Sequence, residues 1–73
     1  MLKIMDVDYV KDYTLALTFN DGVKKVVDIK PYLTGKAFES LLDLKNFKQY
    51  GLTHQTIEWA SGVDFAPEFL YSL

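Results

Sequence analysis

Two β-prone runs joined by a turn signal decide the fold: Tyr13-Thr-Leu-Ala-Leu-Thr-Phe19, then Asn20-Asp21-Gly22, then Val23-Lys-Lys-Val-Val-Asp-Ile29. Asn-Asp-Gly suits a three-residue hairpin loop, in which a type I turn is followed by glycine at positive φ. Side chains alternate across a strand, so the residues that this loop pairs form one mostly apolar face. The predicted pairs are Phe19 with Val23, Leu17 with Lys25, Leu15 with Val27, and Tyr13 with Ile29.

A shorter loop over Asp21-Gly22 would shift the pairing by one residue. It would place Leu15 opposite Asp28 and mix apolar with charged side chains on each face, which argues against it. In the favoured register, Ala16 and Val26 are cross-strand neighbours on the opposite, mostly polar face. Together with Trp59, these two residues are the candidate interaction residues of the chain, because exposed apolar side chains and aromatic residues are common at interfaces.

The remaining segments predict an α+β fold in a single domain over residues 1–73. We expect a small antiparallel β-meander of three N-terminal strands, the first over residues 3–10, plus a short later strand over residues 56–59. One or two short helices over residues 36–50 and a C-terminal helical turn opened by Pro67 complete it. Residues 47–52 are ambiguous between strand and irregular chain, and whether residues 36–50 form one helix or two is left open.

Finer expectations concern faces and caps. In the helical segment, Phe38, Leu41 and Leu42 recur at the spacing of one helix face, and Asp43 is a candidate N-cap for a further turn. In the first strand, alternation predicts one face with Met5, Val7 and Tyr9, and another with Ile4, Asp6 and Asp8.

The composition argues against several kinds of partner. The chain has 73 residues and a net charge of −2, and its basic residues are dispersed lysines with no arginine. Arginine gives bidentate contacts to phosphate and guanine, so direct nucleic-acid binding is not expected. No apolar run approaches the roughly 20 residues that span a bilayer, and no signal-peptide pattern is present, so we expect no membrane association. The absence of cysteine favours a reducing, cytoplasmic location.

Residues with chemical potential are few. An enzyme or ligand-binding domain would require His54, Glu58 and Asp64 to converge in a pocket. His54 is the only histidine, and a metal site would need more ligands at suitable spacing, so an exposed loop histidine is the favoured interpretation. No phosphate loop or nucleophile elbow is present. We therefore predict no catalytic residue, no cofactor and no metal.

Aspartates and a glycine are better explained by structure. Asp6, Asp8 and Asp12 lack the glycine and terminal glutamate of a calcium loop, so solvated strand faces are the favoured interpretation. Gly22 serves the hairpin loop. Asp28 is expected to face polar neighbours or to accept backbone bonds from the turn that follows it, and Asp64 to accept backbone N–H groups at the start of the final helical turn. Trp59 is more often part of the core in a domain this small.

Several motifs together resemble the small bacterial domain-of-unknown-function family 2442. They are Tyr13-x-Leu15-x-Leu17-x-Phe19, Asp21-Gly22, Val27-Asp28-Ile29, Phe38, Leu41-Leu42, Phe47, Ile57-x-Trp59, and Asp64-Phe65-Ala66-Pro67-Glu68-x-Leu70-Tyr71. The resemblance covers essentially the whole chain. It implies a compact α+β domain without established catalytic residues. Some relatives continue into a helix-turn-helix-like domain, which we do not expect in a sequence that stops at Leu73, and others look like partners in toxin–antitoxin pairs.

Three functional hypotheses follow. The first is a non-enzymatic interaction module that binds a protein partner or itself, because a chain this short buries only roughly 60% of its unfolded surface and gains from association. The second is a component or regulator of a toxin–antitoxin-like pair, which the family resemblance alone implies. The third is a ligand-binding or enzymatic domain around His54, Glu58 and Asp64.

Overall fold

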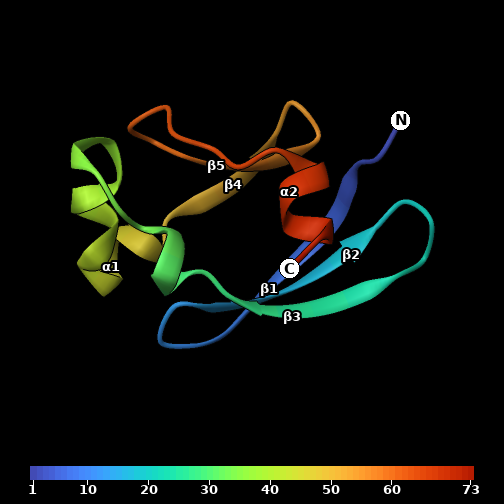
Figure 1. Cartoon of the computed structure of the whole chain (residues 1–73), viewed down its shortest axis with the longest axis horizontal. Helices are drawn as coiled ribbons and strands as arrows, with labels where there is room; N and C mark the ends of the chain where they lie inside the picture. Colours follow the sequence, from blue (N-terminus) through green and yellow to red (C-terminus); the bar gives the residue numbers. More distant parts are fainter.

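The computed structural model describes residues 1–73 as two antiparallel sheets with a shared core. Strands β1 (Ile4–Lys11), β2 (Thr14–Phe19) and β3 (Lys24–Asp28) form the first sheet in that order, and β4 (Tyr50–Thr53) pairs with β5 (Thr56–Trp59) in the second. Two 3₁₀ helices, η1 (Lys30–Tyr32) and η2 (Lys36–Leu42), precede helix α1 (Leu44–Phe47), and helix α2 (Pro67–Tyr71) ends the chain. Figure 1 shows the sheets on opposite sides of the molecule, with α2 between them and α1 at one end. The predicted small α+β fold is confirmed.

The β2–β3 hairpin has the predicted register. Leu15, Leu17 and Phe19 of β2 are fully buried, at 0–1% exposure, as the predicted apolar face requires. The Phe19 amide donates to the Val23 carbonyl at 2.8 Å, and Gly22 closes the loop at φ +89°. The paired residues are Thr14–Asp28, Leu15–Val27, Ala16–Val26, Leu17–Lys25 and Thr18–Lys24.

Strand β1 pairs with β2 through an irregularity that changes its faces. The register shifts between Ile4 and Asp6, so one extra residue is inserted relative to β2. A bulge of this kind moves the alternation by one residue. Ile4 therefore enters the core at 4% exposure and Met5 points outward at 60%. The prediction that grouped Met5 with Val7 and Tyr9 was wrong at this end, although Val7 and Tyr9 do pack against the core.

Residues 36–47 form two separate helical pieces, which answers the question left open by the sequence. Asp43 lies between them in an extended conformation, and its carboxylate accepts the Lys45 amide at 3.0 Å, as expected of an N-cap. The first piece is a 3₁₀ helix, in which residues three apart lie in line. Phe38 and Leu41 consequently share the inner side, whereas Leu42 is 43% exposed and departs from the predicted face.

The chain contains one strand more than expected, and this strand forms a separate two-stranded sheet with the predicted later strand. Residues 56–59 form β5 as predicted, and the ambiguous stretch contributes its partner β4. The connecting residues His54 and Gln55 both have positive φ, at 52° and 70°, as a two-residue type I′ turn requires. Ile57 and Trp59 are buried on the inner face of this hairpin.

The C-terminal turn begins at Pro67, as predicted, and buries Leu70. Its N-cap is Ala66, which makes no side-chain capping bond, so the capping role expected of Asp64 is wrong. The backbone of Asp64 instead forms an isolated antiparallel bridge with Glu58, which extends the second sheet by one pairing and keeps Asp64 two residues ahead of the cap.

Candidate interaction surface

The outer face of the first sheet, turned away from the core, carries a small apolar patch formed by Ala16 and Val26. These two residues are direct cross-strand partners in the centre of the β2–β3 hairpin. Val26 is 65% exposed, whereas its chain neighbour Val27, on the inner face, is 5% exposed. The alternation of strand side chains thus displays one valine of this pair to solvent and buries the other.

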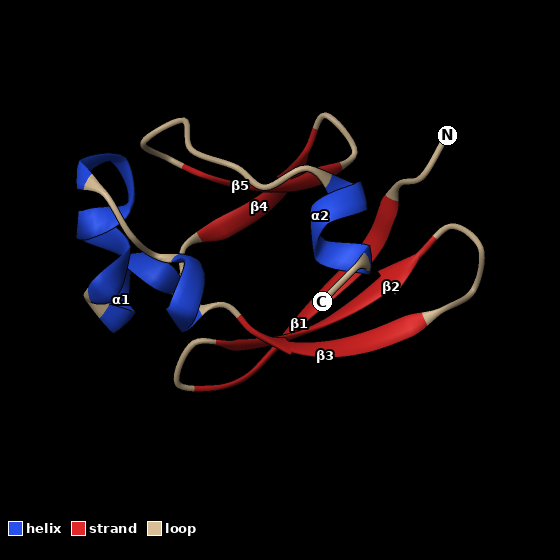
Figure 2. Cartoon of the chain, in the orientation of Figure 1, coloured by secondary structure: helices blue, strands red, loops and turns tan.

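Nothing in the fold covers this outer face. The core cluster draws all of its sheet members from the inner face, and α2 packs there through an edge-to-face contact between Tyr71 and Phe19 with ring centroids 4.9 Å apart. In Figure 2, α2 lies on the side of the sheet that faces β4 and β5. The residues that flank or pair with these two on the outer face are polar or charged: Asp6, Asp8, Thr14, Thr18, Lys24 and Asp28. Farther along β1, Val10 is also exposed, at 47%.

Trp59, the third candidate interaction residue, lies inside the molecule. Its side chain is 3% exposed, and the indole Nε1 donates to the Phe47 carbonyl at 2.8 Å. The ring packs on Phe47 and Phe65, with centroids 5.7 and 6.0 Å away. Trp59 therefore connects the second sheet to α1 inside the core and is not part of an exposed interaction surface.

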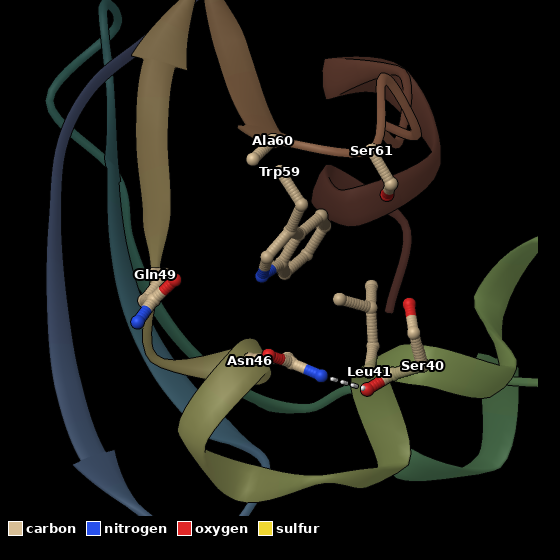
Figure 3. A pocket seen from close by; sticks show the side chains of 7 residues that line it. All are labelled: Ser40, Leu41, Asn46, Gln49, Trp59, Ala60 and Ser61. Carbon is tan, nitrogen blue, oxygen red and sulfur yellow. Dashed lines mark hydrogen bonds between the residues drawn. The ribbon is translucent and has the colours of Figure 1, made fainter.

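A hollow of about 190 Å³ lies beside Trp59. Figure 3 shows the Trp59 indole between β5 and the helical segment that carries Leu41 and Asn46. The Asn46 amide donates to the Ser40 carbonyl at 3.0 Å, and the lining as a whole has no charged side chain. The volume is below the roughly 300–1,000 Å³ typical of small-molecule sites.

His54, Glu58 and Asp64 do not enclose a common cavity. The His54 side chain is 88% exposed, and its Nδ1 lies 3.7 Å from Glu58 Oε1. Thr53 also donates its hydroxyl to this carboxylate. A second, more open hollow of about 470 Å³ is lined by Glu58 but by neither His54 nor Asp64. His54 and Glu58 thus lie beside each other on an open surface, and Asp64 is joined to Glu58 only by a backbone bridge.

The other aspartates lie on strands and turns. Asp6 and Asp8 lie on the outer face of β1. Asp12 lies in the β1–β2 turn and has a positive φ of 47°. No group of three or more His, Asp or Glu side chains is arranged to hold a metal ion. Asp28 accepts the Lys30 amide at 3.1 Å, so of its two expected roles the structure shows the bond to the following turn.

The hairpin loop makes a contact with the C-terminal helix that the sequence did not reveal. The Tyr71 hydroxyl donates to Asp21 Oδ2 at 2.7 Å, and the Val23 amide donates to Asp21 Oδ1 at 3.0 Å. The Val23 bond, followed by the Tyr71 bond, holds the pKa of the Asp21 carboxyl below its ordinary 3.8. The hydrogen bond to Asp21, with desolvation and the carboxylate charge, raises the pKa of Tyr71 above its ordinary 10.0.

Residues 4–73, nearly the whole chain, match one protein family, described as "Protein of unknown function (DUF2442)". The chain belongs to the DUF2442 family. Its membership confirms the resemblance that the hairpin, Ile57-x-Trp59 and the Asp64–Tyr71 segment indicated. No curated protein and no solved structure shows significant similarity to this DUF2442 chain. None of its helices combines the length and apolar character needed to cross a membrane.

Proposed function

We propose that this DUF2442 protein is a non-enzymatic interaction module, which binds a protein partner or a second copy of itself through the outer face of its β2–β3 hairpin. The observation that carries the proposal is the exposure of Val26, at 65%, on a sheet face that no element covers. A buried core valine is explained by folding, but a valine turned to solvent in the middle of β3 gains from being covered by a partner.

The surroundings of the patch support binding of protein rather than of a small molecule. The face is bordered by charged side chains of both signs, Lys24 and Asp28 on β3 and Asp8 on β1. A central apolar contact with a polar rim is the usual anatomy of a modest protein interface. The alternative centre at His54 lacks an enclosing cavity, and we therefore favour the hairpin face.

The toxin–antitoxin alternative is a special case of the same proposal. It predicts that the gene beside this one encodes a small toxin-like protein, and that this protein binds the hairpin face. Reading the neighbouring genes, and then mixing the two purified proteins, tests this version directly.

The general proposal is tested by comparing the wild-type protein with Val26→Asp. The substitution adds a charge at the centre of the patch while Val27 and the core stay unchanged. We expect sedimentation and affinity retention to show an interaction of the wild-type chain, with itself or with a host protein, that Val26→Asp weakens. Leu52→Asp, which changes another exposed apolar residue (40% exposed) on β4, is the control and should leave the interaction intact. Indistinguishable behaviour of all three proteins would contradict the proposal.

A further inference from the structure

Strand β3 is the open edge of the first sheet. The strand order β1-β2-β3 leaves β1 and β3 at the two edges, but β1 lies beside the second hairpin. There the Ile4 amide donates to the Gln55 carbonyl at 3.0 Å, and the Lys48 ammonium lies 5.0 Å from the Tyr9 ring centroid. Burial of Tyr50 against this strand, with the nearby charges of Asp8 and Asp6, raises the Tyr50 pKa. In Figure 1, β3 runs along the margin of the molecule with no element beyond it.

Alternation of the backbone groups determines which residues of β3 are free to pair. The Phe19 amide bonds to the Val23 carbonyl, and the Ile29 amide bonds to the Tyr13 carbonyl, each at 2.8 Å. Residues at even spacing from Val23 therefore direct their N–H and C=O groups toward β2, and the intervening residues direct theirs outward. The outward residues are Lys24, Val26 and Asp28. A row of unpaired groups of this kind is a template for another strand.

The outward residues have a self-complementary order. Lys24 and Asp28 are equally distant from Val26, one with a positive and one with a negative side chain. An antiparallel copy of the same strand, centred on Val26, places valine opposite valine and each lysine opposite an aspartate. All of these side chains lie on the same outer face as Ala16, so the apolar contact continues the patch already described.

We propose that the partner of this surface is a second copy of the chain, whose β3 pairs antiparallel with β3 about a twofold axis at Val26. The pairing joins the three strands of each copy into one continuous sheet. This inference rests on the proposed function, because it assigns the partner of the same hairpin. It places that partner beside the β3 edge, where the Val26 side chain lies next to its copy on the outer face.

The chemistry of the pairing favours this register over its neighbours. Hydrogen-bonded pairs recur every second residue, so Val26 with its copy and Lys24 with Asp28 of the second copy all use outward groups. Sliding by one pairing in one direction sets Lys24 opposite Lys30, and sliding in the other direction sets Asp28 opposite Gly22. Both shifts lose the opposite-charge pairs, and like charges placed directly opposite are unfavourable. Asp28 Oδ1 already accepts the Lys30 amide, which leaves Oδ2 for the lysine.

The expected dimer is weak and reversible. Strand β3 has five residues, and a strand of that length spans roughly 17 Å. Such an edge contact is smaller than the roughly 1,200–2,000 Å² of a standard stable interface. We therefore expect a dissociation constant of roughly micromolar to millimolar size. A dimer in this range responds to protein concentration and, through its ion pairs, to salt.

Charge reversal tests both the partner and the register. In Lys24→Asp the two copies present only acids at the paired positions, and in Asp28→Lys they present only lysines. We expect sedimentation equilibrium to show that each variant alone associates roughly tenfold or more weakly than the wild type. An equimolar mixture of the two variants should regain wild-type association, because each acid then faces a lysine. Lys36→Asp makes the same charge change at an exposed residue of η2 and should associate like the wild type.

Unfolding curves of each variant establish that it folds. If loss of the Lys30 hydrogen bond unfolds Asp28→Lys, Asp28→Asn retains an acceptor, and Lys24→Gln with Asp28→Asn then replaces the mixing test. That neutral protein should lose the salt dependence shown by the wild-type dimer.

Three results would overturn the inference. They are a mixture that associates no better than its components, a neutral variant with wild-type salt dependence, and a wild-type chain that stays monomeric at about millimolar concentration. If the wild type is monomeric but Val26→Asp still abolishes binding of another protein, the second copy is the wrong partner and the proposed function stands. If neither interaction exists, both proposals fail.

Discussion

The hairpins β2–β3 and β4–β5 turn the chain by different means. In the first loop the residue with positive φ is Gly22, at 89°. In the second turn His54 and Gln55 have positive φ, at 52° and 70°. A non-glycine residue in that region costs roughly 1–2 kcal/mol, so surrounding contacts must stabilise the second turn. These include the Ile4 bond to the Gln55 carbonyl and the burial of Ile57 at 0% exposure. The first hairpin is thus specified by its own residues, and the second by its packing.

The largest predicted effect is the loss of stability when a leucine of the first hairpin, rather than one of the second, is replaced by alanine. Leu15 lies opposite Val27 and is 0% exposed, while Leu52 lies opposite Ile57 and is 40% exposed. Leu15→Ala should lower the free energy of unfolding by about 2–5 kcal/mol, the cost of a cavity in a packed core. Leu52→Ala should cost about 1 kcal/mol or less. Urea unfolding measures both, and equal losses would show that the second hairpin contributes as much to the core as the first.

The next effect compares one glycine from each hairpin. An added Cβ meets nothing within 4 Å at either Gly22 or Gly51, but only Gly22 has a positive φ. Gly22→Ala should therefore lower the free energy of unfolding by about 1–2 kcal/mol through backbone strain alone. Gly51→Ala should stay within about 0.5 kcal/mol of the wild type. Thermal or urea unfolding decides the point, and a harmless Gly22→Ala would contradict the loop conformation described above.

A third change replaces the two residues of the β4–β5 turn with residues that adopt positive φ at low cost, as Gly22 does in the first loop. The double variant His54→Asn with Gln55→Gly suits a type I′ turn and should raise the free energy of unfolding by about 1 kcal/mol. It also removes the imidazole that lies 3.7 Å from Glu58. Glu58→Gln in the wild-type background is the control for that contact. A loss of stability in the double variant would mean that the His54 side chain, rather than packing, maintains the turn.

The smallest effect concerns pH and the contact between the first loop and α2. Because the folded-state pKa of Asp21 lies below its ordinary 3.8, its ionised form stabilises the fold above that pH. The contribution disappears as the pH falls through the folded-state pKa. Asp21→Asn should flatten the acid limb of the stability profile, and Tyr71→Phe should do so less, because the Val23 bond remains. Identical acid profiles for all three proteins would show that the loop carboxylate does not contribute.

The same contrast explains how much could be predicted. The register and buried face of β2–β3 followed from Asn20-Asp21-Gly22, because loop type and alternation act within a few residues. Strand β4 was ambiguous because Gly51 weakens the strand pattern and His54-Gln55 is not a typical turn pair. The inserted residue between Ile4 and Asp6 has no local signature, so Ile4 was assigned to the wrong face.

The candidate surface likewise has one part that the sequence predicts and another that depends on tertiary packing. That Ala16 and Val26 are neighbours on an outer face follows from the hairpin register alone. That β3, rather than β1, is the uncovered edge depends on where the second hairpin packs, and the contact of Asp21 with Tyr71 depends on where α2 docks. Both are tertiary contacts between segments far apart in the chain, which propensity and spacing do not determine.

Hydrogen exchange of the β3 amides at increasing protein concentration tests the central claim most directly. In the single chain the outward amides of Lys24, Val26 and Asp28 are open to solvent, while those of Lys25 and Val27 pair with β2. Pairing with a second copy predicts that protection of the three outward amides rises with concentration and that protection of the inward pair changes little. Outward amides that exchange at the same fast rate at every concentration would contradict the claim that β3 is the self-pairing edge.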